Sequence, residues 1–324
     1  MQKNKILFWG SIIAICAGCI IGFQNQVVIK NDSAQNPIST LDYIIPVITN
    51  NPIVKSIESL SFGQNSPAES VVPPQRTTIS ALAYGTYYVS SNSQTKNLIG
   101  QNLDTPLRIA SITKLMTALV ATSLMNKNDV IQISEGDLVE GTLSRYKVGD
   151  KLTLDQLLYS LLIESDNEAA QAIADHYGLA KFIQAMNTQA LSLGMTNTKY
   201  YNPSGLDSPN LSQDNLSTVS DLTKLAEYLE LKYPNIFAVS ALSSYKIMDA
   251  SGNLHHVANS TDKLIDEFAV NFMVGGKTGY TGRAKQNLII LRAKNGDEGY
   301  YIDTVLSSDD RFGDMKLLIS KNAN

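Results

Sequence analysis

The chain has 324 residues, of which 44% are hydrophobic and 17% charged, a balance typical of a globular protein with a sizeable core. Its formal net charge of -4, with a sequence pI near 5.4 and no arginine-rich run, argues against a nucleic-acid-binding surface. Small molecules and peptides are the partner classes that remain.

The first 26 residues are a predicted membrane anchor. Lys3 and Lys5 precede an apolar run from Ile6 to Phe23, which as a helix would be about 27 Å long, close to the thickness of a hydrocarbon core. The flanking lysines place this end in the cytoplasm and the rest of the chain outside. No Ala-x-Ala site stands where a signal peptidase would cut, which favours an uncleaved anchor over a removed signal peptide and a secreted chain. Lipidation at Cys19 is another alternative, because an Ala-Gly-Cys triplet ends there.

Residues 27–75 are a predicted flexible extracytoplasmic linker. The stretch is rich in Asn, Ser, Gln and Pro, and its prolines interrupt any periodic pattern. About fifty flexible residues have a reach on the order of 40 Å, which would let a folded domain work away from the bilayer. Both cysteines, Cys16 and Cys19, lie in the anchor, so the domain that follows, residues 76–324, needs no disulfide framework.

Predicted strands lie at both ends of this domain. The segment from Thr78 to Val89 alternates and is rich in Ala, Tyr and Val, which favours a strand. A polar turn follows, and a short run from Leu98 to Gly100 would complete a hairpin. Near the other end two predicted strands, Asn287 to Ala293 and Tyr300 to Leu306, are joined across Asn295-Gly296, a strong turn signal.

The middle of the domain is predicted to be helical. A capping box of Thr153 and Gln156 begins an apolar helix that breaks at residues 164–167. Two helices, Glu168 to Tyr177 and Ala180 to Leu193, follow and end at glycines, and a closing helix is predicted over residues 309–321. The expected fold class is α+β, with an antiparallel sheet from both ends of the domain packed against a helical middle.

The stretch from Ala110 to Met125 is a predicted buried helix that carries two reactive groups. Its apolar residues cover most of a helical wheel, yet Ser111 and Lys114 lie one turn apart on one face. Because burial lowers the pKa of an ammonium, a neutral Lys114 could take the proton of the Ser111 hydroxyl, as the base for a nucleophile. Ser-x-x-Lys is a weak pattern, since four more copies lie in polar segments, starting at Ser93, Ser144, Ser243 and Ser260.

Two further segments could bring polar groups to a site. The interruption Ser165-Asp166-Asn167 between two apolar helices can hold its side chains rigidly. Lys277-Thr278-Gly279 precedes the strand at Asn287, and its glycines would let a peptide backbone approach while Lys277 and Thr278 offer a cation and a hydroxyl to a carboxylate. Taken alone, Lys-Thr-Gly is more often an ordinary surface turn.

The three histidines do not suggest a catalytic base or a metal site. His176 lies late in a predicted amphipathic helix, where it would cap the last turn. His255 and His256 are neighbours in a β segment and are expected to point to opposite faces, which disfavours a shared metal ion. A lysine base for Ser111 is the option that remains.

The three motifs occur in the order found in penicillin-binding proteins and class A β-lactamases. With the stretches SITKLMT, ESDNEA, NPSGLD and GGKTGYT, the chain resembles the low-molecular-weight D-alanyl-D-alanine carboxypeptidases from roughly Thr78 to Asn322. The resemblance implies a β-lactamase/transpeptidase-like fold and a penicillin-binding serine carboxypeptidase. Such an enzyme removes the terminal D-alanine of peptidoglycan stem peptides through an acyl-enzyme on Ser111, and needs no metal or organic cofactor.

The resemblance also implies a role for each motif residue. Ser111 would be acylated, Lys114 would be its base, and Ser165 would relay a proton toward the leaving group. The backbone N–H groups of Ser111 and Tyr280 would form the oxyanion hole. Lys277 would support the electrostatics of the site, with Thr278 and Thr281 near the substrate carboxylate. The implied substrate-binding residues are Asn167, Lys277, Thr278, Gly279, Tyr280 and Thr281.

The sequence departs from this family in two places. Arg283, Ala284 and Lys285 stand where relatives usually show an acidic residue and then Ala-Gly. Two added cations there would alter the affinity for the terminal carboxylate or slow deacylation. The chain also stops soon after the domain, without the β-rich second domain or C-terminal amphipathic anchor of many relatives, and the N-terminal helix would replace that anchor.

Two other functions stay open on the sequence. A class A-like β-lactamase needs a carboxylate that activates the deacylating water, but no convincing Glu-x-x-x-Asn is present and NPSGLD favours the carboxypeptidase. A catalytically inactive sensor domain would keep the penicillin- and peptidoglycan-binding pocket without turnover. Arg283 and Lys285 make that alternative conceivable.

Overall fold

The computed structural model describes residues 77–139, 145–268, 273–293 and 299–322. The predicted anchor and linker, and the predicted Asn295-Gly296 turn, lie outside these ranges. Within the described ranges, no helix combines the length and the apolar character that crossing a membrane requires. The anchor, the linker and the alternative at Cys19 therefore stay predictions.

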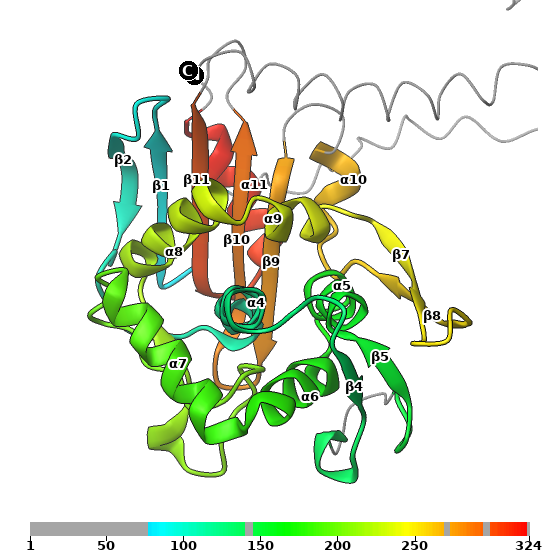
Figure 1. Ribbon diagram of the computed structural model, residues 1–324. Helices are drawn as coiled ribbons and strands as arrows, with labels where there is room; N and C mark the ends of the chain where they lie inside the picture. Colours follow the sequence, from blue (N-terminus) through cyan, green and yellow to red (C-terminus); the bar gives the residue numbers. More distant parts are fainter. Residues whose placement is uncertain (1–76, 140–144, 269–272, 294–298, 323–324) are drawn as a thin grey trace, which may run out of the picture. The chain divides into compact units, whose positions relative to one another are not determined.

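A five-stranded antiparallel sheet forms the centre of the domain, in the order β2-β1-β11-β10-β9 (Figure 1). Strand β1 pairs with β11, so that the first and the last long strands of the domain lie side by side. The prediction of one sheet from both ends of the domain is confirmed. The strands are β1 (Ala83–Val89), β2 (Thr95–Gln101), β9 (Met273–Thr281), β10 (Lys285–Ala293) and β11 (Tyr300–Ser308).

The first strand is shorter than predicted, since it begins at Ala83 and not at Thr78. The N–H groups of Ser80 and Ala81 donate to the carboxylate of Asp314 at 2.9 and 2.8 Å. Asp314 lies in α11 (Arg311–Ser320), the predicted closing helix. A side chain from the other end of the domain therefore takes the hydrogen bonds that would have extended the strand.

Helices cover both faces of the sheet (Figure 1). On one face, α11 packs against β1, β10 and β11 and buries Met315 and Leu318 beside Leu288 and Val305. On the other face, α8 (Val219–Lys232) packs against β1 and β11, and α9 (Asn235–Ser240) packs against β9. Helices α8 and α9 are not among the elements predicted from the sequence.

The helices predicted for the middle of the domain are present in the predicted order, with ends that differ by a few residues at most. Thr153 caps α5 by accepting the N–H of Gln156, whereas the Gln156 side chain accepts the N–H of Met248 and does not complete the capping box. Helix α6 ends at Gly178, whose φ of 97° favours glycine. The helices are α4 (Thr113–Leu124), α5 (Leu154–Ile163), α6 (Asn167–Tyr177) and α7 (Leu179–Ser192).

Three short antiparallel strand pairs lie outside the five-stranded sheet in the described part of the chain. One of them joins the segment before Ser111 to the segment after NPSGLD, because β3 pairs with β6. Another, β7 with β8, lies beside α5. The pairs are β3 (Leu107–Arg108) with β6 (Leu216–Ser217), β4 (Val130–Gln132) with β5 (Lys151–Thr153), and β7 (Ser244–Met248) with β8 (Leu254–Asn259). A one-turn helix, α10 (Ile265–Phe268), precedes β9.

Candidate active site

Lys114 lies fully buried near the beginning of α4. Its Nζ is 2.9 Å from the Oγ of Ser111. The same amine donates to the Oδ1 of Asn167 and to the carbonyl oxygen of Ser204, each at 2.8 Å. The start of α4, the start of α6 and the NPSGLD stretch therefore meet at one nitrogen, and the contact that the Ser-x-x-Lys spacing predicted is present.

The surroundings of Lys114 lower the pKa of its amine to about 7. Burial is the largest cause because it disfavours the charged form, and the carboxylate of Asp166 acts in the opposite direction. A substantial fraction of the amine is therefore uncharged near neutral pH and able to accept a proton. The lysines of the four other Ser-x-x-Lys copies are all exposed: Lys96, Lys147, Lys246 and Lys263.

Ser111 lies in a single 3₁₀ turn, Ala110–Ile112, at which the chain enters α4. The preceding residue, Ala110, has a φ of 47°, a conformation that residues with a side chain rarely adopt. Gly205 of the NPSGLD stretch approaches this turn so closely that a Cβ there would lie 1.9 Å from the carbonyl oxygen of Ala110. The backbone that carries Ser111 is therefore held from outside its own helix.

Ser165 and Asn167 come from the turn between α5 and α6. Asp166 caps α6, since its Oδ1 accepts the N–H of Ala169 at 2.7 Å, and Asn167 is the first residue of that helix. Ser165 is half-buried and has a φ of 64°, in the left-handed region. Burial raises the pKa of Asp166 to about 6, and the charge of Glu164 acts in the same direction.

The Lys-Thr-Gly motif lies in a buried part of β9, so its interpretation as a surface turn is wrong. Lys277 is 1% and Thr278 4% exposed, on the edge strand of the sheet. A Cβ on Gly279 would lie 2.7 Å from the carbonyl oxygen of Ile109 and 3.1 Å from the backbone nitrogen of Ser111. Only glycine allows β9 to pass so close to Ser111, and the next residue, Tyr280, is 65% exposed.

Lys277 is a second buried amine of the site. Its Nζ donates to the carbonyl oxygen of Thr278 at 3.2 Å. Burial lowers the pKa of Lys277 well below its ordinary value, and the charges of Lys114 and Arg311 act in the same direction. The protonation of Lys277 therefore depends on the charge carried by Lys114.

The two threonines of the motif bond to groups of the protein. The Oγ1 of Thr278 is 2.6 Å from the Oγ1 of Thr261. Thr281 donates to the Oδ1 of Asp207 at 2.6 Å, and Asp207 is the last residue of NPSGLD. Thr281 therefore ties β9 to the stretch whose Ser204 carbonyl reaches Lys114.

The two unusual cations, Arg283 and Lys285, pair with carboxylates of the same chain. The Nε of Arg283 is 3.3 Å from an oxygen of Asp207, and its Nη1 is 3.0 Å from an oxygen of Asp214. The Nζ of Lys285 is 2.9 Å from Asp309, at the surface. Arg283 therefore fastens the segment after Ser204 to the β9–β10 turn, and carboxylates balance both added charges.

Two further residues of the site were missed in the sequence. Arg311, the first residue of α11, donates from Nη1 to the carbonyl oxygen of Gly279 at 3.0 Å. Asn215 donates to the Oγ1 of Thr113 at 3.0 Å and to the carbonyl oxygen of Asn202 at 2.9 Å, which links NPSGLD to α4. No local pattern marks either residue, because each meets its partner only in the folded chain.

The prediction that His255 and His256 point to opposite faces is wrong, since their Nδ1 atoms lie 2.7 Å apart. In the β7–β8 pairing, Ile247 is opposite His256 and Met248 is opposite Leu254. His255 is therefore the extra residue of a β-bulge, which breaks the alternation of side chains along the strand. Within the described residues there is no group of three or more side chains suited to hold a metal ion.

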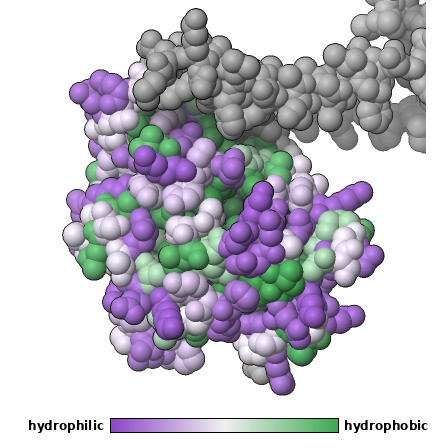
Figure 2. Space-filling view, in the orientation of Figure 1, coloured by the Kyte–Doolittle hydropathy of each residue, from purple (hydrophilic) through white to green (hydrophobic). Residues whose placement is uncertain are grey.

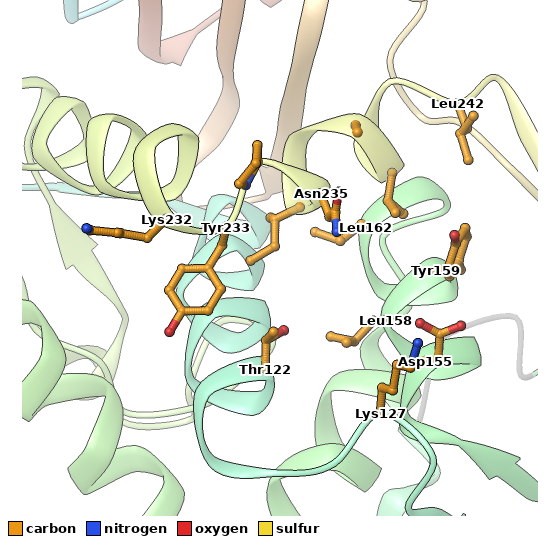
Figure 3. Close-up of a pocket in the computed structure, with 14 residues that line it drawn as sticks. Thr122, Lys127, Asp155, Leu158, Tyr159, Leu162, Lys232, Tyr233, Asn235 and Leu242 are labelled. Carbon is orange, nitrogen blue, oxygen red and sulfur yellow. The ribbon is translucent and has the colours of Figure 1, made fainter. Parts of the chain in front are cut away.

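A cavity of about 580 Å³ lies away from these residues, between α4, α5, α8 and α9 (Figure 3). Thr122, Leu158 and Tyr233 are among its lining residues, and none of the predicted site residues lines it. Thr122 is eight residues after Lys114 in α4, about 12 Å along the helix axis.

Polar and apolar side chains are interspersed over the face of the molecule shown in Figure 2, so the hydropathy of this face does not single out a site.

The arrangement of sheet and helices is that of the penicillin-binding proteins and their transpeptidase relatives. A D-alanyl-D-alanine carboxypeptidase from Mycobacterium tuberculosis is similar, with a TM-score of 0.66, 25% identity, and coverage of 80% of this chain and 95% of that chain. A penicillin-binding protein from Listeria monocytogenes in its ampicillin-bound form has a TM-score of 0.64 and 27% identity, over 76% of this chain and 98% of that chain. The predicted fold class is confirmed.

The chain belongs to the D-alanyl-D-alanine carboxypeptidase family, which residues 73–308 match. A D-alanyl-D-alanine endopeptidase from Pseudomonas aeruginosa is 34% identical over 236 residues, which cover 70% of this chain and 74% of the relative. A D-alanyl-D-alanine carboxypeptidase from a Streptomyces species is 31% identical over 262 residues, covering 75% and 85%. The family and the enzyme class predicted from the motifs are confirmed: the protein is a serine-type, penicillin-binding D-alanyl-D-alanine carboxypeptidase.

Proposed function

We propose that Ser111 is the nucleophile of this carboxypeptidase and Lys114 its general base. The observation that carries the assignment is the 2.9 Å contact between the Lys114 Nζ and the Ser111 Oγ, together with a pKa of Lys114 lowered to about 7. The neutral amine takes the hydroxyl proton while the Oγ attacks the carbonyl carbon of the penultimate D-alanine. The peptide bond then breaks, the terminal D-alanine leaves with a proton, and water hydrolyses the ester to restore Ser111.

The other motif residues are assigned to the same reaction. Ser165 relays the proton toward the leaving nitrogen, and Asn167 hydrogen-bonds the substrate backbone as well as the Lys114 amine. The backbone N–H groups of Ser111 and Tyr280 stabilise the oxyanion. The approach of Gly279 to the backbone of Ser111 supports this pairing. Lys277, Thr278 and Thr281 bind or orient the substrate carboxylate along the edge strand.

The same nucleophile accounts for the binding of β-lactams. Attack of the Ser111 Oγ on the carbonyl carbon of the four-membered ring breaks the ring amide and leaves an ester on the enzyme. The leaving nitrogen stays attached to the acyl group and shields it from water. A slowly hydrolysed ester is therefore expected with penicillin, in contrast with the ester formed from the peptide.

We also propose that the domain works outside the cytoplasmic membrane, on the cell-wall peptidoglycan, and that its activity contributes to wall synthesis and cell shape. The support is the apolar run from Ile6 to Phe23 behind Lys3 and Lys5, followed by a polar stretch long enough to act as a tether.

Covalent labelling by a fluorescent penicillin tests the assignment of nucleophile and base. Label on the wild-type protein should disappear in Ser111→Ala, with an unchanged circular dichroism spectrum. Lys114→Met should slow labelling on the order of a thousandfold, because general-base catalysis contributes effects of this size. Lys96→Met is the matched control, since Lys96 ends another Ser-x-x-Lys copy but is exposed. A wild-type protein that takes no label would overturn the assignment.

Product analysis separates the carboxypeptidase from the alternatives. Release of D-alanine from a model pentapeptide excludes an inactive sensor, and rapid steady-state hydrolysis of a chromogenic cephalosporin would favour a β-lactamase. A cross-linked dimeric peptide should be assayed beside the pentapeptide, because the relatives include proteins named endopeptidase. The ratio of the two rates measures how much of each cleavage this chain performs.

A further inference from the structure

Four side chains form a continuous row next to the Ser165 turn. The Nδ1 atoms of His255 and His256 are 2.7 Å apart. At the outer ends of the row, the Nε2 of His255 is 3.0 Å from an oxygen of Asp150, and the Nε2 of His256 is 2.6 Å from the Oε1 of Glu164. Both imidazoles are largely buried, with 13% and 11% of their side chains exposed. The bulge at His255 is what allows both rings to lie in one row.

The geometry of this row determines how many protons it can hold. Each outer Nε2 faces a carboxylate, which is only an acceptor, so each must carry a proton. The two inner Nδ1 atoms face each other, and only one proton fits between them. Three protons on two rings are one more than two neutral imidazoles carry, so the pair bears a single positive charge. A fourth proton would place two N–H groups head to head, and removal of the third would break one bond of the row.

Glu164 connects this pair to the active site. Its Oε1 also accepts the hydroxyl of Ser160, its Oε2 is 3.2 Å from the Nε of Arg145, and its side chain is only 7% exposed. Glu164 is the C-terminal cap of α5 and is followed directly by Ser165, whose φ is 64°. A strained turn persists only where its surroundings hold it. The contacts of Glu164 stabilise this turn from the position directly before Ser165, the residue proposed to relay the proton.

We propose that His255 and His256 form a singly charged pair that shares one proton and, through Glu164, positions the Ser165 turn. The inference rests on the proposed function for its effect on catalysis, but the proton shared between the rings does not depend on that function. His256 and Glu164 are positioning residues, because neither touches the Ser111–Lys114 pair. The positive charge of the pair strengthens the contact with Glu164, so a variant that loses this contact should acylate more slowly.

The charged groups around the pair support a net charge of +1. Tyr146 stacks on His255 at 5.2 Å between ring centroids and meets His256 edge-on, and its hydroxyl donates to Ser160. Burial works to raise the pKa of Asp150, but the hydrogen bond from His255 and the N–H of Lys147 keep it below the ordinary value. The titratable and charged groups that face the pair or its partners are Arg145, Tyr146, Lys147, Asp150, Glu164, Asp166, Glu168 and Asp249.

Nuclear magnetic resonance of the full chain, labelled with ¹⁵N-histidine, measures the proton count directly. Both rings should show a proton on Nε2, and one further proton should be shared between the two Nδ1 atoms. His176, which is exposed on α6, is the internal control for an imidazole outside the row. Only two ring N–H protons on the pair, one for each ring, would overturn the shared proton.

The rate of penicillin acylation tests the positioning role. His256→Ala removes the donor to Glu164 and should slow acylation on the order of tenfold, because small displacements of catalytic groups cost at least this much. His256→Gln keeps a neutral donor at the same place, so it should restore most of the rate. His176→Gln should leave the rate unchanged.

Two results would contradict the positioning role: a wild-type rate in His256→Ala, or a rate in His256→Gln no higher than that of His256→Ala. Thermal unfolding of both variants identifies a general loss of structure, and the glutamine variant keeps the test valid if the alanine variant fails to fold. If the wild-type protein takes no label, the proposed function fails, while the resonance experiment still decides the protonation of the pair.

Discussion

The two ends of α4 differ in what they bury. Near its beginning, the Lys114 amine is enclosed and makes hydrogen bonds to Ser111, Asn167 and Ser204. Toward its end, Thr122 borders a cavity of about 580 Å³, a volume ordinary for a ligand pocket (Figure 3). The motifs nevertheless converge on the first end. A buried amine is costly unless its partners compensate for lost water, so a paired buried charge marks a site better than volume does.

The largest effect on stability and labelling is expected from a substitution that pushes the NPSGLD stretch away from the beginning of α4. Gly205→Ala places a Cβ against the Ala110 carbonyl in a residue with a φ of 85°. We expect a loss of unfolding free energy of at least about 3 kcal/mol and penicillin labelling slowed on the order of a hundredfold. Urea denaturation and the labelling rate measure the two effects.

Gly252→Ala is the matched control for that substitution. Gly252 has nearly the same φ, 84°, but no atom lies within 4 Å of its Cβ position. Its replacement should lower the free energy of unfolding by about 1 kcal/mol, the cost of placing a side chain at a positive φ, and should leave the labelling rate unchanged. Equal losses in the two variants would show that the contact with Ala110 does not hold the site.

A smaller effect is expected from Asp166→Asn, which keeps an oxygen to cap α6. The Asp166 carboxylate raises the pKa of Lys114, so its removal should lower that pKa further. Because the neutral amine is the base, the acid side of the acylation profile should shift to lower pH. A series of labelling rates between pH 5 and 9 gives the midpoint, and a midpoint that does not move would contradict this coupling.

The same substitution should change the pH dependence of stability. The pKa of Asp166 is raised to about 6 in the folded protein from an ordinary value of 3.8, so the folded state holds this proton more tightly than the unfolded state. The resulting stability is present below pH 3.8 and is lost as the pH rises through about 6. Asp166→Asn should therefore be more stable than the wild type above that pH, as measured by urea denaturation.

The smallest effect on catalysis is expected at the cavity. Leu158→Ala removes a half-buried side chain that lines it, and should cost about 1 to 2 kcal/mol of unfolding free energy. The labelling rate and its pH profile should stay unchanged, because none of the predicted site residues lines the cavity. A labelling rate that falls together with the stability would show that the two ends of α4 are coupled, and would contradict their independence.

Much of the fold followed from short-range patterns in the sequence. The alternation of the first strand, the turn signal between β10 and β11, and the apolar stretches of α4 to α7 placed those elements to within a few residues, because such signals lie between neighbours along the chain. Two predictions, the start of the first strand and the orientation of His255 and His256, were wrong for the same reason. The Asp314 side chain delays the start of β1, and the bulge at His255 turns two neighbouring rings toward each other. Both depend on residues distant in sequence or on pairing irregularities that no local pattern encodes.

The sequence by itself determined the reactive pair. Residues three positions apart in a helix lie on one face, and this spacing brings the Ser111 hydroxyl and the Lys114 amine together. It also determined the class of enzyme, because three short motifs in a fixed order are specific together. Only the tertiary structure decided the surroundings that make the amine a base, with Ser204 supplied from 90 residues away and Arg311 reaching Gly279. The physical reason is that hydrogen-bond partners and burial set a pKa, and folding alone brings those groups together.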